Sequence, residues 1–358
     1  MQSENLFDLT PEQDDRAARL HAKSDFVDAL VAGTDYLDDP DYQDSLAEGG
    51  VTAGNLTVGG PSDDFTATTE GIVDVCRKIR ANDDRYLVAE SVTDIGRARD
   101  SGRTGIILGF QGGAPIGKSL DKLRAFYRLG VRIIGLTYNR ANYLGDGCCE
   151  SRDGGLTMLG RDVVDEMNEL GVVIDTAHDG DRTTADVIEH SNDPVIQSHI
   201  GCRALCPSQG RAKTDEQLRA VADGGGVNAI TPFPPVIKRD PDTHEVQRAT
   251  VHDVLDHIDH AVDVAGVDHV GFGADMSDKA LDRGTMSQGS NLKTWRPTHP
   301  EVYGRGSTTE MDPYPEGLDR YHRMENLTRG LVSRGYSDED IEKILGGNML
   351  RVFDDVWS

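Results

Sequence analysis

The chain has 358 residues, and a (β/α)8 barrel with insertions would account for that length as a single unit. It carries 62 acidic against 37 basic residues, and the net charge of −25 argues against nucleic acids and anionic membranes as partners. Only 9 of the basic residues are Lys. An acidic, Lys-poor surface suits very high salt, so we expect a halophilic protein, with an acidic mesophilic protein as the alternative.

Short runs rich in Val, Ile and Thr, bounded by Gly, Pro, Asn and Asp, predict eight strands. In chain order they cover residues 25–31, 51–58, 104–111, 131–138, 171–178, 194–199, 226–233 and 269–275. Helical spacing of apolar residues predicts helices at 119–130, 159–171, 215–225 and 250–266. The run at 85–90 indicates an extra strand or part of a crossover.

Strands that alternate with helices predict a parallel sheet, and eight of them predict closure into a (β/α)8 TIM barrel. A doubly wound open sheet is the alternative, but no GxGxxG follows the first strand. We expect one domain over 1–358, with an N-terminal extension at 1–20. The Gly- and Ser-rich segment 276–315 predicts a long loop after strand 8, and 316–358 predicts a helical tail.

The chain is expected to lie in the cytoplasm. It contains no run of 18 apolar residues, and its first residues lack the basic and apolar regions of a signal peptide. Five cysteines are an odd and sparse number, which indicates reduced thiols.

Polar side chains end six of the predicted strands. They are Asp28, Gln111, Tyr138, His178, His199 and Asp275. Because barrel active sites lie at the C-terminal ends of the strands, we expect these side chains to gather at one rim of the barrel.

His178 and His199 end adjacent strands, so their imidazoles can share one metal ion, for which zinc is well suited. The alternative is a structural role for both histidines. Asp28 could add a carboxylate ligand or cap a helix. Asp275 could act as a base, contact a substrate amine, or make a cap or loop hydrogen bond.

Other candidate residues give weaker signals. His252, His257 and His260 share one predicted helix, which we interpret as part of the outer surface of the barrel. Cys202 and Cys206 form a CxxxC without a second pair, which is a weak zinc signal.

Four stretches of the chain resemble the membrane (renal) dipeptidase family of metallopeptidases. They include VVIDTAHDGDRTTADVIEHSNDPVIQSHIGC and, further along, HIDHAVDVAGVDHVGFGADM and GYSDEDIEKILGGNMLRVF. The resemblance covers roughly residues 20–358. It implies a (β/α)8 barrel with a two-zinc site that hydrolyses dipeptides, some with a C-terminal D-residue. The family is often dimeric, which implies a homodimer.

The resemblance also implies roles for individual residues. His178 and His199 match the two histidines that hold the second zinc. Arg211 matches the arginine that grips the substrate carboxylate, with a one-residue shift in the preceding loop, and Asp275 matches an aspartate thought to help in proton transfer.

Three positions depart from the family pattern. Phe26 stands where the family has a ligand histidine two residues before Asp28, and Gln111 replaces a bridging glutamate. Tyr138 replaces a histidine that assists catalysis, and its hydroxyl could contact the substrate and stabilise the oxyanion. We therefore expect one zinc ion, held by His178 and His199 with Asp28 or Gln111, and a weak or empty first site.

These observations lead to three hypotheses. The first is a metal-dependent hydrolase that cleaves a dipeptide, or a similar small amide with a carboxylate, by means of a metal-activated water. The second keeps the chemistry but takes a non-peptide amide or an N-modified amino acid. The third is a non-catalytic barrel that binds a small carboxylated ligand.

Overall fold

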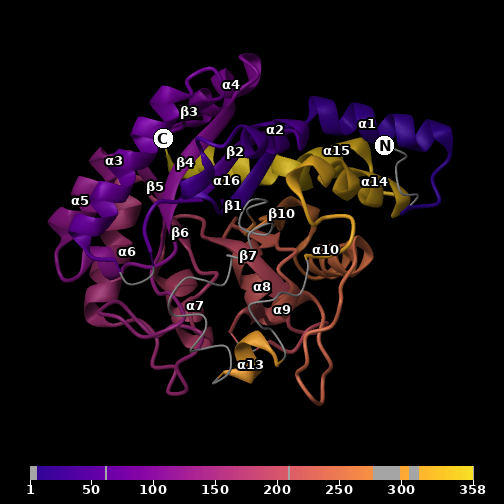
Figure 1. Cartoon of the computed structure of the whole chain (residues 1–358). Helices are drawn as coiled ribbons and strands as arrows, with labels where there is room; N and C mark the ends of the chain where they lie inside the picture. The colour runs from indigo at the N-terminus through magenta and orange to yellow at the C-terminus, as the bar shows by residue number, and fades with distance from the viewer. Residues whose placement is uncertain (1–5, 61–62, 209, 277–298, 306–313, 358) are drawn as a thin grey trace.

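Eight parallel strands form the centre of the molecule (Figure 1). The computed structural model describes residues 6–60, 63–208, 210–276, 299–305 and 314–357. The strands run in the order β1 (Phe26–Val31), β2 (Val51–Thr57), β4 (Thr104–Phe110), β5 (Val131–Gly135), β6 (Val173–Asp175), β7 (Ile196–Cys202), β9 (Val227–Ile230) and β10 (Val270–Phe272). Each of the eight predicted strands is confirmed, as is the (β/α)8 barrel.

The barrel closes between its first and last strands. Val31 forms a parallel bridge with Met276, and the backbone N–H of Asp275 donates to the carbonyl of Leu30 over 2.8 Å. Two short strands lie beside the eight: β3 (Tyr86–Val88) pairs with β4, and β8 (Ala212–Lys213) pairs with β7. The run at 85–90 is therefore an extra strand.

Helices surround the barrel and begin at residues that suit helix N-termini. Thr10 and Thr214 each form a capping box with the glutamine three residues later. In chain order the helices are α1 (Pro11–Lys23), α2 (Pro40–Glu48), α3 (Phe65–Ala81), α4 (Val92–Asp100), α5 (Leu120–Arg128), α6 (Met158–Leu170), α7 (Asp181–His190), α8 (Asp215–Asp223), α9 (Pro234–Ile237), α10 (Val251–Ala265), α13 (Pro300–Tyr303), α14 (Glu325–Ser333), α15 (Asp338–Glu342) and α16 (Asn348–Val356).

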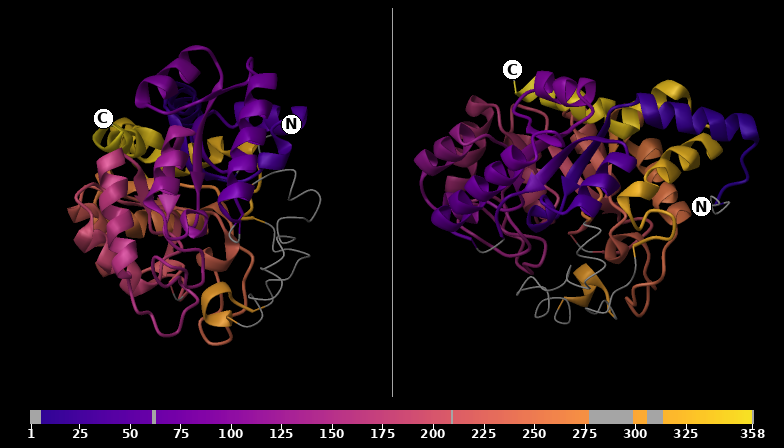
Figure 2. Two further views of the ribbon diagram at one scale, coloured as in Figure 1. Left: turned by 90° about the vertical axis from the view of Figure 1, so that its left-hand side faces the viewer. Right: turned by 45° about the horizontal axis from the view of Figure 1, so that its top comes forward.

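The interior of the barrel is filled from the strands and covered at one end by α16. Val27 and Ala29 of β1 pack in one apolar cluster with residues of β2, β4, β5, β6, β7 and β9. Met349 and Phe353 of α16 belong to the same cluster. Figure 2 shows α16 and the other C-terminal helices at the end of the barrel opposite to α13. Since side chains alternate along a strand, Asp28 lies on the other face of β1.

The two ends of the chain pack against each other outside the barrel. Helix α1 lies along α14, where Arg329 pairs with Asp14 at 2.7 Å, and Arg16 pairs with Asp338 near α15 at 2.6 Å. The predicted extension at 1–20 thus includes most of a docked helix, and the predicted helical tail is confirmed. Much of the predicted loop 276–315 lies outside the described residues.

The sequence predicted that His257 lies on the outer surface of the barrel, but the side chain is buried. It is 1% exposed on α10, where its Nδ1 accepts the N–H of Cys202 at 2.8 Å and its Nε2 donates to the carbonyl of Ile237 at 3.0 Å. Burial lowers the pKa of His257 to about 4. The imidazole is therefore neutral at pH 7 and ties α10 to β7.

This lowered pKa predicts a stability that depends on pH. Because the folded pKa lies below the unfolded one, His257 contributes stability that is fully present above about pH 6.5 and is lost as the pH falls towards 4. We expect this contribution to be about 3 kcal/mol. Urea denaturation of His257→Gln should show a smaller loss between pH 7 and 4 than the unmodified protein. His260→Gln, at a more exposed position of the same helix, is the control, and equal losses in the unmodified and His257→Gln proteins would contradict the prediction.

Candidate active site

His178 and His199 face each other at the C-terminal rim of the barrel. Their Nε2 atoms lie 3.0 Å apart, and both side chains are buried. Burial, together with the nearby charges of Arg211 and Lys213, holds the pKa of each histidine well below its ordinary value. Both imidazoles are therefore neutral at pH 7 and can offer nitrogen lone pairs.

Gln111 and Asn139 complete the surroundings of His178. The Oε1 atom of Gln111 lies 2.9 Å from the Nε2 of His178, while the other end of the amide donates to the hydroxyl of Thr57 at 2.9 Å. On the opposite side of the ring, the Nδ1 of His178 lies 2.9 Å from the Oδ1 of Asn139. The hydroxyl of Tyr303 donates to the same oxygen at 2.5 Å.

The donor set fits one metal ion. Zinc binds imidazole nitrogen at about 2.0–2.1 Å, so two such ligands in a tetrahedral site lie roughly 3.3 Å apart. The 3.0 Å between the two Nε2 atoms is close to that value, and the Oε1 of Gln111 offers a third electron pair. Within the described ranges, no group of three or more His, Cys, Asp or Glu residues could hold an ion, so an ion here would rest on two imidazoles and the amide oxygen of Gln111. A second metal has no evident ligand set among the described residues.

The contacts of Asp28 differ from those expected of the metal ligand that the sequence predicts. Its Oδ1 accepts the N–H groups of Leu30 at 3.1 Å and Ala274 at 2.8 Å, and its Oδ2 accepts the hydroxyl of Tyr321 at 2.8 Å. Burial raises the pKa of this carboxyl to about 7. These contacts join β1 to the segment after β10, and metal ligation by Asp28 stays a prediction that they do not support.

Replacing Asp28 by alanine tests which role it has. We expect Asp28→Ala to lower the free energy of unfolding by about 2–3 kcal/mol, because three buried hydrogen bonds lose their acceptor. Zinc bound per chain, measured by atomic emission after dialysis, should stay the same. A loss of zinc from a variant that unfolds at the same urea concentration as the unmodified protein would instead identify Asp28 as a ligand.

Arg211 is almost fully buried behind the histidine pair. Its two terminal nitrogens donate to the carbonyls of Ala177 at 2.6 Å and His199 at 3.4 Å, and it is 1% exposed. Its Nε has no hydrogen-bond partner among the residues that the structure describes. In this arrangement Arg211 braces the chain beside both histidines, and its contact with a substrate carboxylate stays a prediction.

Tyr138 and Asp275 lie at the same rim. The ring of Tyr138 packs on that of His178, with 4.1 Å between the centroids and 31° between the planes. Asp275 follows β10 with a left-handed φ of 48°, which is uncommon for a residue with a side chain and is found at functional sites. The structure thus brings together the predicted residues Gln111, Tyr138, His178 and His199, and it places Asp275 where the barrel closes.

Four further residues belong to the site and were not predicted. Three of them lie within three residues of a predicted residue in the sequence: Asn139, Asp175 and Ser198. No sequence pattern at these positions indicates a role in the site. Tyr303 comes from α13, which lies below the strand ends in Figure 1 and is anchored through its carbonyls by Arg239.

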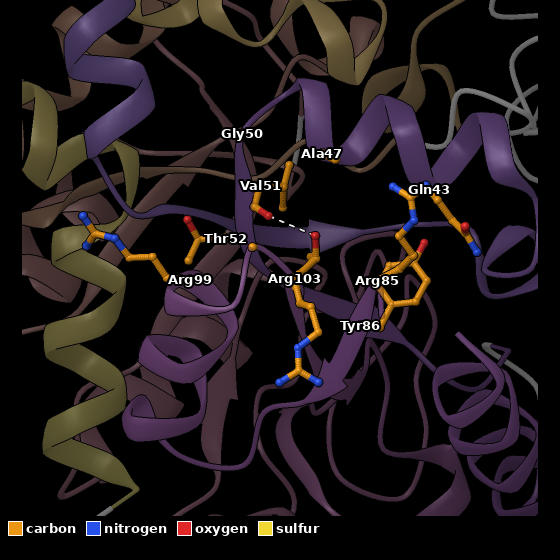
Figure 3. Close-up of a pocket in the computed structure, with 11 residues that line it drawn as sticks. Gln43, Ala47, Gly50, Val51, Thr52, Arg85, Tyr86, Arg99 and Arg103 are labelled. Atoms are coloured by element: carbon orange, nitrogen blue, oxygen red, sulfur yellow. Dashed lines mark hydrogen bonds between the residues drawn. The ribbon is translucent and has the colours of Figure 1, made fainter. Parts of the chain in front are cut away.

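A separate hollow lies beside the N-terminal ends of β2 and β4 (Figure 3). It has a volume of about 180 Å³ and is lined by Arg85, Arg99 and Arg103, among others. Arg85 pairs with Asp44 at 3.1 Å and Arg99 pairs with Asp25 at 2.8 Å. The three guanidinium groups point in different directions in Figure 3, so they do not converge on a common ligand.

A family model described as membrane dipeptidase (Peptidase family M19) matches residues 19–292 and 305–357. Dipeptidase tcpJ of Claviceps purpurea is 30% identical over 275 residues, which is 76% of this chain and 56% of that protein. Dipeptidase aclJ of Aspergillus oryzae is 30% identical over 286 residues, 79% of this chain and 59% of that protein. The chain thus spans less than two thirds of these relatives.

Solved structures share the fold over nearly the whole chain. An amidohydrolase from Pseudomonas aeruginosa is 33% identical, with a TM-score of 0.82 over 95% of this chain and 99% of that one. The probable dipeptidase PvdM from the same organism is 21% identical, with a TM-score of 0.76 over 97% of this chain and 99% of that one, and shows the fold alone. In the described part of the chain, no helix is long and apolar enough to cross a membrane.

Proposed function

Because the chain belongs to the membrane dipeptidase family, peptidase family M19, we propose that it is a hydrolase of dipeptides or similar small amides that works with one bound metal ion. The facing pair of neutral imidazoles, with Nε2 atoms 3.0 Å apart and an amide oxygen beside them, carries this proposal. His178 and His199 would hold the ion, with Gln111 as a third, weaker ligand. We propose zinc, since it prefers imidazole nitrogen.

The other residues at the rim would bind the substrate and stabilise charge. A bound ion supplies Lewis acidity at the scissile carbonyl and activates water. Tyr138, fixed against His178, would donate its hydroxyl to the oxyanion that forms as the carbonyl is attacked. Asp275 would hold the substrate amine or take up the proton. Arg211 would attract the substrate carboxylate through its Nε, which has no hydrogen-bond partner among the described residues.

We also propose that the chain is a single-domain cytoplasmic protein that works at high salt as a homodimer. The net charge of −25 with few lysines supports the adaptation to salt. The continuous barrel with its docked terminal helices supports one domain.

Metal content and turnover together test the proposed function. The protein is purified in molar KCl, loaded with zinc, dialysed and assayed for metal, and then assayed on a panel of L,L- and L,D-dipeptides. We expect about one zinc per chain and hydrolysis of at least one dipeptide. A protein that binds no divalent metal and cleaves no dipeptide would contradict the proposal.

Two observations support other functions, and the same assay can test both. The amidohydrolase that shares the fold at 33% identity supports a non-peptide amide or an N-acyl amino acid as substrate, so these join the panel. The described residues provide no carboxylate ligand to the histidine pair, which supports a barrel that only binds a carboxylated ligand. Ligand binding without any turnover would establish that function.

A further inference from the structure

A chain of buried hydrogen bonds leads from Asp175 through Ser198 to His199. The hydroxyl of Ser198 donates to the Oδ2 of Asp175 at 2.5 Å, and the Nδ1 of His199 lies 2.7 Å from the same hydroxyl oxygen. The Oδ1 of Asp175 accepts two backbone N–H groups, from Ala177 and from Ser198 itself, both at 3.0 Å. All three side chains are at most 4% exposed, so water does not compete for these bonds.

The number of protons in this chain fixes the tautomer of His199. Burial raises the pKa of Asp175, but three donors, the N–H groups of Ala177 and Ser198 and the Ser198 hydroxyl, converge on it and favour its ionised form. An ionised carboxylate can only accept, so the single proton of the Ser198 hydroxyl points to Asp175. The hydroxyl oxygen must then accept from His199, which places the ring proton on Nδ1 and the lone pair on Nε2. His178 stands between two acceptor oxygens, with its Nδ1 2.9 Å from the Oδ1 of Asn139 and its Nε2 2.9 Å from the Oε1 of Gln111, so its ring proton can occupy either nitrogen.

The lone pair on the Nε2 of His199 therefore points at the Nε2 of His178 over 3.0 Å in the metal-free protein. The contact is a hydrogen bond when His178 carries its proton on Nε2, and a metal ion would take the place of that proton. If His199 itself carried its proton on Nε2, it would have no lone pair there to offer a metal.

We propose that Asp175, acting through Ser198, is the positioning residue that keeps the Nε2 of His199 unprotonated and so keeps the histidine pair open to a metal ion. The metal half of this inference rests on the proposed function. The proton arrangement does not, because it follows from contacts of the metal-free chain.

The geometry predicts that the nearly isosteric change Asp175→Asn reverses the direction of the hydrogen bonds from residue 175 through Ser198 to His199. The two backbone N–H groups require an oxygen at the Oδ1 position, so the new amide must turn its NH2 towards Ser198. The hydroxyl of Ser198 then accepts from the amide and donates to the Nδ1 of His199. The proton of His199 moves to Nε2 and forms a hydrogen bond with the Nε2 of His178.

The experiment measures the tautomer and the zinc affinity separately. Long-range ¹H–¹⁵N NMR spectra of the metal-free proteins report which nitrogen of each histidine carries the proton. We expect Nδ1–H for His199 in the unmodified protein and Nε2–H for His199 in Asp175→Asn. Competition with a chelator should show zinc binding weakened by about 10- to 100-fold in the variant. The metal-free variant should melt close to the unmodified protein, because the hydrogen bonds from residue 175 to His199 are reversed and none is lost.

Asp186→Asn is the matched control. Asp186 is also buried and accepts a backbone N–H, from Leu156 at 3.0 Å, but it pairs with Arg182 on α7 and not with a histidine of the site. Its replacement should leave the tautomer of His199 and the zinc affinity unchanged. Should Asp175→Asn fail to fold, Ser198→Ala breaks the same chain and should give His199 a mixture of tautomers.

The results separate this inference from the proposed function. If His199 in Asp175→Asn keeps its proton on Nδ1, or if zinc affinity stays within about threefold of the unmodified protein, the inference is wrong. A reversed tautomer with weakened zinc binding, in a protein that hydrolyses nothing, would uphold the inference and contradict the proposed function.

Discussion

Hydrolysis is expected to fall by at least roughly 10³-fold when either His178 or His199 is replaced by alanine, because the metal ion proposed to activate water would be lost. The two imidazoles are the main electron-pair donors of the candidate metal centre, and their Nε2 atoms face each other at 3.0 Å. One histidine and one amide oxygen cannot hold an ion at micromolar concentration. Zinc bound after dialysis should therefore fall together with kcat/KM, and excess zinc should restore little activity.

His260→Ala is the control for these two variants. His260 lies on α10, where it pairs with Asp215 at 2.8 Å near the surface, and its replacement should leave zinc content and turnover unchanged. If His178→Ala or His199→Ala folds and still hydrolyses the substrate within about tenfold of the unmodified rate, the pair does not form the catalytic metal site.

Removal of the Tyr138 hydroxyl is expected to lower kcat by about 10²- to 10³-fold with little change in KM or zinc content. The change Tyr138→Phe keeps the aromatic ring that packs on His178 at 4.1 Å, so the position of the metal ligand is preserved. The change removes the proposed donor to the oxyanion. This separates an effect on the transition state from an effect on metal binding.

Tyr143→Phe serves as the matched control, since the side chain of Tyr143 is 56% exposed and contacts none of the proposed ligands in the described structure. We expect its kinetic constants to match those of the unmodified protein. An unchanged kcat for Tyr138→Phe would show that Tyr138 only supports the ring of His178 and that another group stabilises the oxyanion.

The barrel could be predicted because its eight strands are almost entirely buried and are bounded by turn-forming residues. A run such as 104–111 therefore differs clearly from its neighbours, and β4 indeed spans Thr104–Phe110 with every residue buried. Helix α7 was not predicted, since the sequence of Asp181–His190 contains two threonines and few apolar residues. It is held by packing against its neighbours, which helical spacing does not reveal.

The candidate site was predictable where a side chain lies near the C-terminal end of a strand. His178 follows β6 and His199 lies within β7, and they meet because neighbouring parallel strands end at the same rim. Asp28 lies within β1, where the pleat decides which face a side chain takes and a shift of one residue reverses it. The pairing of β1 with β2 is irregular at this point, so the sequence could not fix the direction of Asp28. Tyr303 reaches Asn139 across 164 positions of the chain, which no local pattern indicates.

Covering the barrel interior with α16 has a consequence for the synthesis of the protein. Helix α16 follows all eight strands in the chain, so a ribosome completes every strand before it makes the segment that buries their apolar interior. Until Met349 and Phe353 emerge, the nascent barrel exposes that interior to water and to other chains. Chaperone binding to stalled nascent chains should therefore persist until α16 has left the exit tunnel.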